Sequence, residues 1–466
     1  MNKHITAALA TAGLLLIPYI SFAQDCAKPF KEGDRIVWMG DSITHGGHYH
    51  SYVWLYYMTR FPDMRIDMVN AGMGGECAWD MVKRIDDDIF GRQATYATLT
   101  FGMNDTGYFD RSKAEDQKRS DALVARSLES FAILEEKIAA HPDMQVTMIG
   151  GSPFDETSQF NKHAISGKNA AMKKLVDEQR EAAGRHGWGF VDFQQPMIDI
   201  SMREQEKNPN FSFNSMDRVH PDSDGQMVMA YLFLKAQGLA GKEVASIFVD
   251  ASTKRALRCS NCSISNIEGN PDSLRFDYLA NALPYPVDSI SQHGWSNKRS
   301  QMDALELVPF TEEFNREILR VKNLKTGSYK LTIDGEPICT VSSEELAEGI
   351  NLAEHKNTPQ YKQASAIMYL NEERLEVEKR LVEYLWVQYE YLRKADLMFA
   401  DNEQALDYLR EIAKKDIFLN ASYYWYKQAI NPDVRKVWAE YMKTLTDKIY
   451  SMNKPVPHII RILPEA

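Results

Sequence analysis

Short apolar runs alternate with longer amphipathic segments between residues 33 and 240. The apolar runs, which are predicted strands, lie at residues 35–39, 66–70, 96–101, 146–150 and 189–193. Segments with apolar residues at helical spacing lie between or after them, at residues 50–60, 79–89, 119–140, 161–186 and 223–237. This alternation predicts an α/β domain in which helices cover both faces of a parallel sheet.

The pattern changes after about residue 245. Strand-like runs follow at residues 274–280, 317–323 and 328–341. Within the last run, Asp334-Gly335 is typical of a hairpin turn. Ser342 and Glu345 have the spacing of a capping box and predict the start of a helix. We therefore predict an α/β domain over residues 24–245 and a small β-rich segment over residues 246–345.

The remaining residues, 346–466, are predicted to form a helical C-terminal extension. From about residue 362 apolar residues recur at helical spacing, and Asn431-Pro432 separates two of the helices. These helices must bury their apolar faces. No long Gly/Ser- or Pro-rich tether precedes them, which favours a fixed arrangement. We expect the extension to dock on the α/β domain near the strand ends, where it would form a wall of a substrate cleft.

The N-terminus has the pattern of an export signal. Lys3 precedes the apolar segment "ITAALATAGLLLIPYI", and "SFA" at residues 21–23 is typical of a cleavage site. The sequence therefore predicts a signal peptide over residues 1–23, cleavage near Ala23 and a periplasmic or secreted protein. A lipid anchor on Cys26 is disfavoured because Asp25 precedes it. No later stretch reaches the roughly 18 apolar residues of a membrane span.

Composition and charge narrow the class of protein. The chain has 466 residues, of which 44% are hydrophobic and 26% are charged, as in ordinary globular proteins. Its net charge of −11 disfavours non-specific binding to nucleic acid or anionic membranes. Among the five cysteines, Cys259 and Cys262 could close a local disulfide in an exported protein. A zinc site there is disfavoured, because no second Cys or His pair stands nearby at ligand spacing.

Four motifs follow predicted strands or precede the last helix of the α/β domain. Ser42, in "GDSIT", is either part of a turn or a nucleophile displayed at a strand end. Asp217 precedes His220 in "DRVHPD", a spacing that lets a carboxylate orient a catalytic histidine, although a helix-start loop has the same composition. The glycine-rich "NAGMGGE" and Asn104 in "GMND" offer hydrogen-bond donors for a developing oxyanion.

With these four motifs the chain resembles the SGNH hydrolase superfamily, the GDSL-type esterases and lipases, over residues 33–240. The resemblance implies a flavodoxin-like three-layer fold and no cofactor. It implies that Ser42 is the nucleophile, that Asp217 and His220 activate it, and that Gly75 and Asn104 join the Ser42 N–H in the oxyanion hole.

Two positions depart from the usual family pattern in the glycine-rich motif. Gly74, the neighbouring candidate for the oxyanion-hole glycine, stands where Ser is more common. Glu76 stands where Asp is more common. These departures do not touch the catalytic atoms, but they leave the shape of the oxyanion loop open.

Other polar residues near the motifs are weaker candidates. His45, His48 and His50 follow the nucleophile closely. We predict substrate contacts for His45, His48 and Asp105. A metal site is disfavoured because the histidines have no carboxylate partners nearby in the sequence. The aromatic run at residues 423–426 is interpreted as helix packing rather than as a sugar-stacking platform.

The resulting hypothesis is a serine ester hydrolase that removes O-acetyl or another small acyl group from a saccharide outside the cytoplasm. The expected partner is an acylated saccharide or other small ester; nucleic acid and an integral membrane span are not expected, and the oligomeric state is open. The alternatives are a lipid or aryl esterase, a site redirected to glycosidic bonds, and a non-catalytic saccharide-binding protein, because a fold does not fix a substrate.

Overall fold

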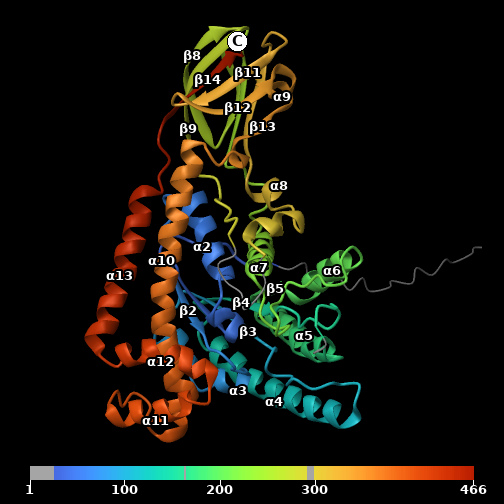
Figure 1. Ribbon diagram of the computed structural model, residues 1–466, viewed down its shortest axis with the longest axis vertical. Helices are drawn as coiled ribbons and strands as arrows, with labels where there is room; N and C mark the ends of the chain where they lie inside the picture. The colour runs from blue at the N-terminus through green and yellow to red at the C-terminus, as the bar shows by residue number, and fades with distance from the viewer. Residues whose placement is uncertain (1–25, 162–163, 291–298, 466) are drawn as a thin grey trace, which may run out of the picture.

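A computed structural model of the protein describes residues 26–161, 164–290 and 299–465. Figure 1 shows an α/β domain in the middle, a β-rich part at one end and a set of C-terminal helices along one side. The predicted signal peptide, residues 1–23, lies outside the described residues, so export remains a prediction.

A parallel sheet of five strands forms the centre of the α/β domain. Its strands are β1 (Arg35–Gly40), β2 (Asp67–Gly72), β3 (Tyr96–Phe101), β4 (Gln145–Gly150) and β5 (Gly189–Asp192). They are arranged in the order β2-β1-β3-β4-β5. This order confirms the flavodoxin-like sheet. The order reverses beside β1, so the loop after β1 lies at the edge where such folds bind ligands.

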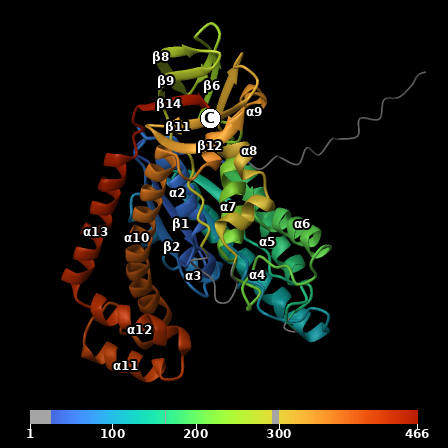
Figure 2. The same ribbon diagram turned by 45° about the horizontal axis from the view of Figure 1, so that its top comes forward.

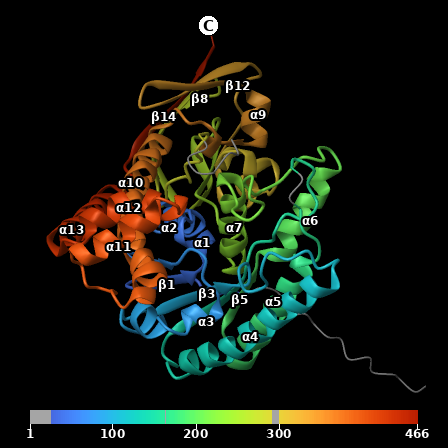
Figure 3. The ribbon, with the colours of Figure 1, turned by 60° about the horizontal axis from the view of Figure 1, so that its bottom comes forward.

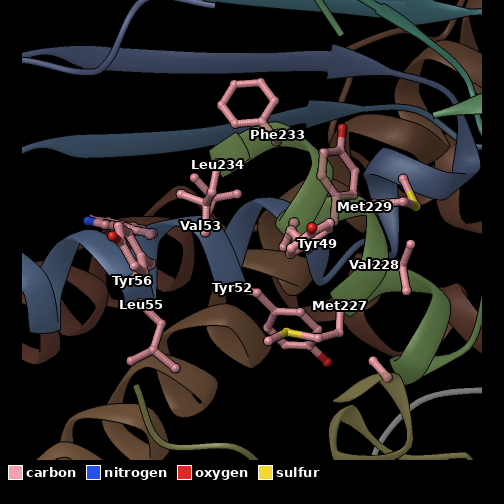
Figure 4. Close-up of a cluster of buried hydrophobic side chains, with 14 of the residues drawn as sticks. Tyr49, Tyr52, Val53, Leu55, Tyr56, Met227, Val228, Met229, Phe233 and Leu234 are labelled. Atoms are coloured by element: carbon pink, nitrogen blue, oxygen red, sulfur yellow. The ribbon is translucent and has the colours of Figure 1, made fainter. Parts of the chain in front are cut away.

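Helices cover both faces of this sheet because its strands are apolar on both sides. Ile36 and Trp38 of β1 point into one buried cluster, whereas Val37 and Met39 point into the other. The first cluster includes residues of α2 (Tyr49–Arg60), α6 (Gln194–Gln205) and α7 (Ser223–Ala236). The second includes residues of α3 (Ala78–Met81), α4 (Ala114–Ala139) and α5 (Lys168–His186). Figure 4 shows large side chains of α2 and α7 packed together next to the sheet.

The helix predictions were correct in place but not in every boundary. Helix α5 begins at Lys168 rather than near residue 161, because Gly167 has φ +79°, which is not helical. The predicted helix 79–89 is divided into α3 and a π-helical turn, Asp86–Phe90. Helix α6 was not predicted; it accommodates Pro196 because a proline is tolerated in the first turn, where the backbone N–H groups have no helical partner.

The β-rich part consists of two sheets packed face to face over one apolar cluster. One sheet contains β6 (Ala245–Asp250), β7 (Arg255–Ser260), β10 (Glu317–Lys322) and β13 (Ile350–Asn351). The other contains β8 (Cys262–Asn270), β9 (Ser273–Ala280), β11 (Ser328–Ile333), β12 (Glu336–Ser342) and β14 (His458–Pro464). Asp334 and Gly335, with φ +53° and +88°, form the predicted hairpin turn, and the capping box opens α9 (Ser343–Glu348).

Two predictions about this region were wrong. The extension is not helical to its end, because β14 pairs with β9 and β11; its buried residues His458, Ile460 and Ile462 alternate as in a strand. Of the segment between β9 and β10, the described residues 281–290 and 299–316 form no strand. This segment contains a 3-10 helix (Gln301–Glu306) and α8 (Phe310–Phe314), and its apolar residues join the core of the α/β domain.

All five cysteines lie in the described ranges and are free thiols. The local disulfide considered for Cys259 and Cys262 is therefore not formed. Cys259 lies in β7 and Cys262 in β8, which belong to different sheets, and the chain passes from one sheet to the other between them.

The extension packs along the α/β domain. Its helices are α10 (Pro359–Val387), α11 (Glu403–Ala413), α12 (Ile417–Ala429) and α13 (Pro432–Met452), and short helical turns continue α10 to Ala395. Figures 1 and 2 show α10 passing from the β-rich part along the side of the sheet, with α13 returning beside it. Asn371 on α10 donates to the carbonyl and hydroxyl of Ser51 on α2, and Glu378 accepts from the N–H of Asn70 on β2. The predicted docking of the extension on the α/β domain is confirmed, and its role as a wall of a substrate cleft stays a prediction.

The aromatic run at residues 423–426 lies on α12, where Tyr426 is buried and stacks on Tyr384 while Tyr424 is exposed. Packing therefore accounts for part of the run. In the part of the chain that the structure describes, no helix combines the length and apolar character needed to cross a membrane.

Candidate active site

Ser42 is the first residue of α1 (Ser42–His45), directly after β1. The side chain of Asp41 caps this short helix by accepting from the N–H of Ile43 at 2.9 Å. The turn is so tight that a Cβ at Gly40 would lie 2.2 Å from the hydroxyl oxygen of Thr44. The sequence "GDS" is therefore a strand–turn–helix junction that holds the serine at the carboxyl edge of the sheet. Burial raises the pKa of Asp41 to about 6.

His220 bridges Ser42 and Asp217. Its Nε2 lies 2.7 Å from Ser42 Oγ, and its Nδ1 lies 2.5 Å from Asp217 Oδ2. The other carboxylate oxygen of Asp217 accepts from the N–H groups of Val219 and His220. Burial opposes ionisation of Asp217, but the hydrogen bonds and charge of His220 outweigh it and lower the pKa. An ionised carboxylate at Nδ1 leaves Nε2 free to accept the serine proton.

The glycine-rich loop after β2 presents two glycines in different ways. The N–H of Gly74 donates to Nδ1 of His45 at 3.1 Å, so it is already occupied. Gly75 has φ +80°, a left-handed conformation that favours glycine. Its N–H has no hydrogen-bond partner within the described ranges. The structure therefore favours Gly75 over Gly74 as the donor for a bound ligand.

Asn104 lies in the loop after β3, with its amide held from both ends. Its Nδ2 donates to the carbonyl of Glu76 at 3.0 Å, and its Oδ1 accepts from the hydroxyl of Tyr108 at 2.9 Å. These bonds fix the amide orientation and leave one of its two N–H groups for a ligand. The N–H of Ser42, at the start of a helix, likewise has no partner in the described part of the chain.

Lys168 holds the loop that carries Asn104 by hydrogen bonds to its backbone. It was not singled out from the sequence. Its buried ammonium donates to the carbonyls of Met103 and Gly107 and to the hydroxyl of Thr106, at 2.5 to 2.7 Å. Burial lowers its pKa to about 7. Nothing in the sequence distinguishes this lysine from its solvent-exposed neighbours on α5.

Arg84 joins the end of β2 to the glycine-rich loop and to the segment after α3. It was also not singled out from the sequence. Its buried guanidinium donates to the carbonyl of Ala71 and to the carboxylates of Glu76 and Asp88. Glu76 is thus part of a buried ion-pair network, which fixes the glycine-rich loop from the side of α3.

Asp105 is not a substrate-binding residue, contrary to the sequence prediction. Its side chain is fully buried, and its carboxylate accepts from the N–H groups of Ala78 and Gly102 and from the hydroxyl of Ser127. A carboxylate that accepts three internal hydrogen bonds stabilises the two loops and is not accessible to a ligand.

The histidines after Ser42 are also buried. His45 lies between Gly74 and Glu383 of α10, with Nε2 at 3.2 Å from the Glu383 carboxylate. His48 packs on Tyr52, and His50 stacks on Trp38. Neither His45 nor His48 is therefore placed for the predicted substrate contact. No group of three or more His, Cys, Asp or Glu side chains within the described ranges is arranged to hold a metal ion.

Comparisons with known proteins agree with this geometry. The model of the GDSL-like Lipase/Acylhydrolase family matches residues 38–228. A solved structure of a gut microbial diltiazem-metabolizing enzyme is 44% identical, with a TM-score of 0.91, over 95% of this chain and 100% of that one. The chain belongs to the GDSL-like lipase/acylhydrolase (SGNH) family. It is an ester hydrolase.

Two further matches describe how this SGNH hydrolase is built. Residues 365–454 match the model of the Diltiazem deacetylase C-terminal helical domain, so the extension is a recognised unit. A curated acetylxylan esterase of Geobacillus stearothermophilus is 23% identical over 224 residues, which are 44% of this chain and 94% of that protein. More than half of this SGNH hydrolase therefore lies outside that match.

Proposed function

We propose that this SGNH hydrolase removes acetyl or another small acyl group from an oxygen ester, with Ser42 as the nucleophile. The observation that carries the proposal is the unbroken series of hydrogen bonds from Ser42 Oγ through His220 to Asp217. His220 Nε2 takes the serine proton while Oγ bonds to the acyl carbon. His220 then gives that proton to the departing alcohol, and a water molecule, deprotonated by His220, releases the acid.

The negative oxygen of the tetrahedral intermediate needs donors that are already in place. We assign this role to the N–H groups of Ser42 and Gly75 and to the remaining amide N–H of Asn104. The support for these three is that each has a donor with no other partner in the described ranges. Each such donor contributes roughly 10²–10³ in turnover in other acyl-transfer enzymes.

We propose an acetylated saccharide outside the cytoplasm as the substrate class. One matching model is named for a diltiazem deacetylase, and one related protein is named an acetylxylan esterase. Both names refer to the acetyl group, which is a small acyl group. Tyr108 and Met216, which are 49% and 55% exposed, flank Asn104 and Asp217 and offer apolar contact to a ring-shaped alcohol. The predicted signal peptide supports the location; N-terminal sequencing of the periplasmic or secreted protein should begin at Gln24, and an uncleaved cytosolic chain would contradict it.

An aryl esterase is the second candidate. It is favoured by the exposed ring of Tyr108, which could stack on an aromatic alcohol.

The two candidates separate in one set of assays on the purified mature protein. Rates on acetylated xylo-oligosaccharides are compared with rates on nitrophenyl esters of increasing acyl length. Ser42→Ala should lower all esterase activity by on the order of 10³-fold or more, whereas Ser451→Ala, an exposed serine on α13, should not. Retention of activity in Ser42→Ala would remove the proposed nucleophile. Higher kcat/KM on the aryl acetate than on every saccharide ester would favour the aryl esterase.

A further inference from the structure

The helical extension reaches the loop that carries Gly75. The indole Nε1 of Trp386, near the end of α10, donates to the carbonyl oxygen of Gly74 at 3.0 Å. This hydrogen bond joins residues 312 positions apart in the sequence. Figure 3 shows the end of α10 and helix α12 on the side of the molecule where α1 lies.

This contact acts on the oxyanion donor through a single peptide group. The carbonyl of Gly74 and the N–H of Gly75 belong to the same planar peptide, in which a trans bond directs them to opposite sides. By holding the carbonyl, Trp386 also fixes the direction in which the Gly75 N–H points. A hydrogen bond accepted by the carbonyl further polarises the N–H of that peptide group.

A second contact from α10 holds the preceding peptide. The N–H of Gly74 donates to His45 Nδ1, so this nitrogen is unprotonated and a neutral His45 carries its proton on Nε2. That nitrogen faces the Glu383 carboxylate at 3.2 Å. Burial opposes ionisation of Glu383, but the adjacent His45 side chain and the hydrogen bond donated by Ser422 outweigh it and lower the pKa. Glu383 and Trp386 are three residues apart on α10 and therefore lie on one face.

Trp386 leaves little room for a side chain at residue 74. A Cβ added at Gly74 would lie 3.2 Å from the indole Nε1, closer than an ordinary contact. A serine at this position would press on the ring and disturb the hydrogen bond. Glycine at residue 74 and tryptophan at residue 386 are therefore matched to each other.

We propose that Trp386 and Glu383 are positioning residues for ester hydrolysis, which orient the Gly74–Gly75 peptide so that the Gly75 N–H faces the developing oxyanion. The proposal rests on the proposed role of Gly75. It makes the extension part of the catalytic apparatus, although neither residue touches the substrate.

The test compares two Trp→Phe variants of the full-length enzyme. Trp386→Phe keeps an aromatic ring but removes the donor to Gly74. Trp438→Phe makes the same chemical change on α13, where the indole packs on Trp425. We expect kcat to fall about 10-fold in Trp386→Phe, less than the 10²–10³ cost of deleting a donor, with KM nearly unchanged. Trp438→Phe should stay within about twofold of wild type, as expected of a substitution away from the reacting groups.

A boronic acid inhibitor supplies a readout that a purely structural role would not change. It bonds to the nucleophilic serine as a tetrahedral anion and so depends on the oxyanion donors. Its affinity should fall in Trp386→Phe in proportion to kcat and stay unchanged in Trp438→Phe. Glu383→Gln, which retains the side-chain shape, should show the same pattern with a smaller loss. It also provides the test if Trp386→Phe does not fold.

The proposal is overturned if Trp386→Phe and Glu383→Gln, both folded, match Trp438→Phe in kcat and in boronate affinity. That result would leave the nucleophile assignment intact provided that Ser42→Ala is inactive. An active Ser42→Ala would instead overturn the proposed function itself, so the two failures are distinguishable.

Discussion

The two sides of the active site are held in different ways. Asp217 and His220 are three residues apart, and their loop is held by its own segment and by a neighbouring loop of the α/β domain: the carbonyl of His220 accepts from the N–H of Ser215, and the Arg218 guanidinium donates to the carbonyls of Asp155, Ser158 and Asn161. The Gly74–Gly75 loop instead depends on Trp386, 312 residues away. The acid–base side of the site is therefore held within the α/β domain, whereas the oxyanion side also depends on the docked extension.

The difference shows which parts of the site tolerate change elsewhere in the chain. A loop held within the α/β domain keeps its geometry when the extension shifts. A loop held by a distant helix loses its geometry when the helix shifts, even if every residue near Ser42 is intact. We therefore expect changes in the extension to alter turnover through the oxyanion side while the hydrogen bonds of His220 persist.

The largest loss of activity should come from disrupting the Asp217–His220 pair. Asp217→Asn keeps the size of the side chain but cannot hold His220 with its proton on Nδ1 or stabilise the imidazolium. We expect kcat to fall by about 10⁴ with no change in folding. Steady-state kinetics and a thermal melt measure both quantities. A loss of less than about 10-fold would show that Asp217 is not the partner of a catalytic histidine.

Deleting a donor on the oxyanion side should cost less. Asn104→Ala removes one donor, and we expect kcat to fall by about 10²–10³ with KM largely unchanged. Kinetics on a small acetate ester measure the two parameters separately. If KM rose and kcat stayed constant, Asn104 would be a ground-state binding residue instead.

Asp41, which caps the short helix that begins at Ser42, should make the stability of the protein depend on pH. Burial raises the pKa of Asp41 from 3.8 to about 6. Between these values the folded protein binds more protons than the unfolded chain, so stability falls as pH rises through this window. Asp41→Asn does not titrate. From pH 4 to pH 7 wild type should therefore lose up to about 3 kcal/mol relative to this variant.

Denaturant unfolding of both proteins at the two pH values tests this expectation. The matched comparison cancels the titration of all other groups that the two proteins share. Parallel pH profiles would mean that Asp41 titrates alike in the folded and unfolded states.

The smallest expected effect is a loss of stability when Lys168, which hydrogen-bonds the loop of Asn104, is replaced. Lys168→Met leaves the carbonyls of Met103 and Gly107 without their buried donor. We expect a loss of about 2 kcal/mol in unfolding free energy, because unpaired buried acceptors are costly. Lys173→Met, on the exposed side of the same helix, serves as the control and should change stability by less than about 0.5 kcal/mol. Equal losses in the two variants would contradict the supporting role of Lys168.

The comparison also shows what the sequence could predict. Ser42, Asn104, Asp217 and His220 stand in short motifs beside predicted strands, and parallel strands bring their carboxyl ends to one edge. The structure joins Ser42, His220 and Asp217 by hydrogen bonds, and it holds Asn104 in the loop after β3. The five strands of the parallel sheet were predicted close to their observed bounds for the same reason: their apolar runs are distinct.

The contacts from the extension could not be predicted in this way. Helical spacing shows that one face of α10 is buried but not which surface covers it, so nothing in the sequence singles out Trp386 or Glu383. The same limit explains the errors at His45 and Asp105. Polar residues next to a nucleophile suggest substrate contact, and only the tertiary structure shows that internal donors and acceptors already occupy them.

The most direct test of the account is to trap the nucleophile with an organophosphonate ester and map the modified peptide. The account predicts a single adduct on Ser42, loss of esterase activity in step with labelling, slower labelling in Trp386→Phe than in Trp438→Phe, and no labelling in His220→Ala. An adduct on another residue, or labelling of Ser42 with activity retained, would contradict it.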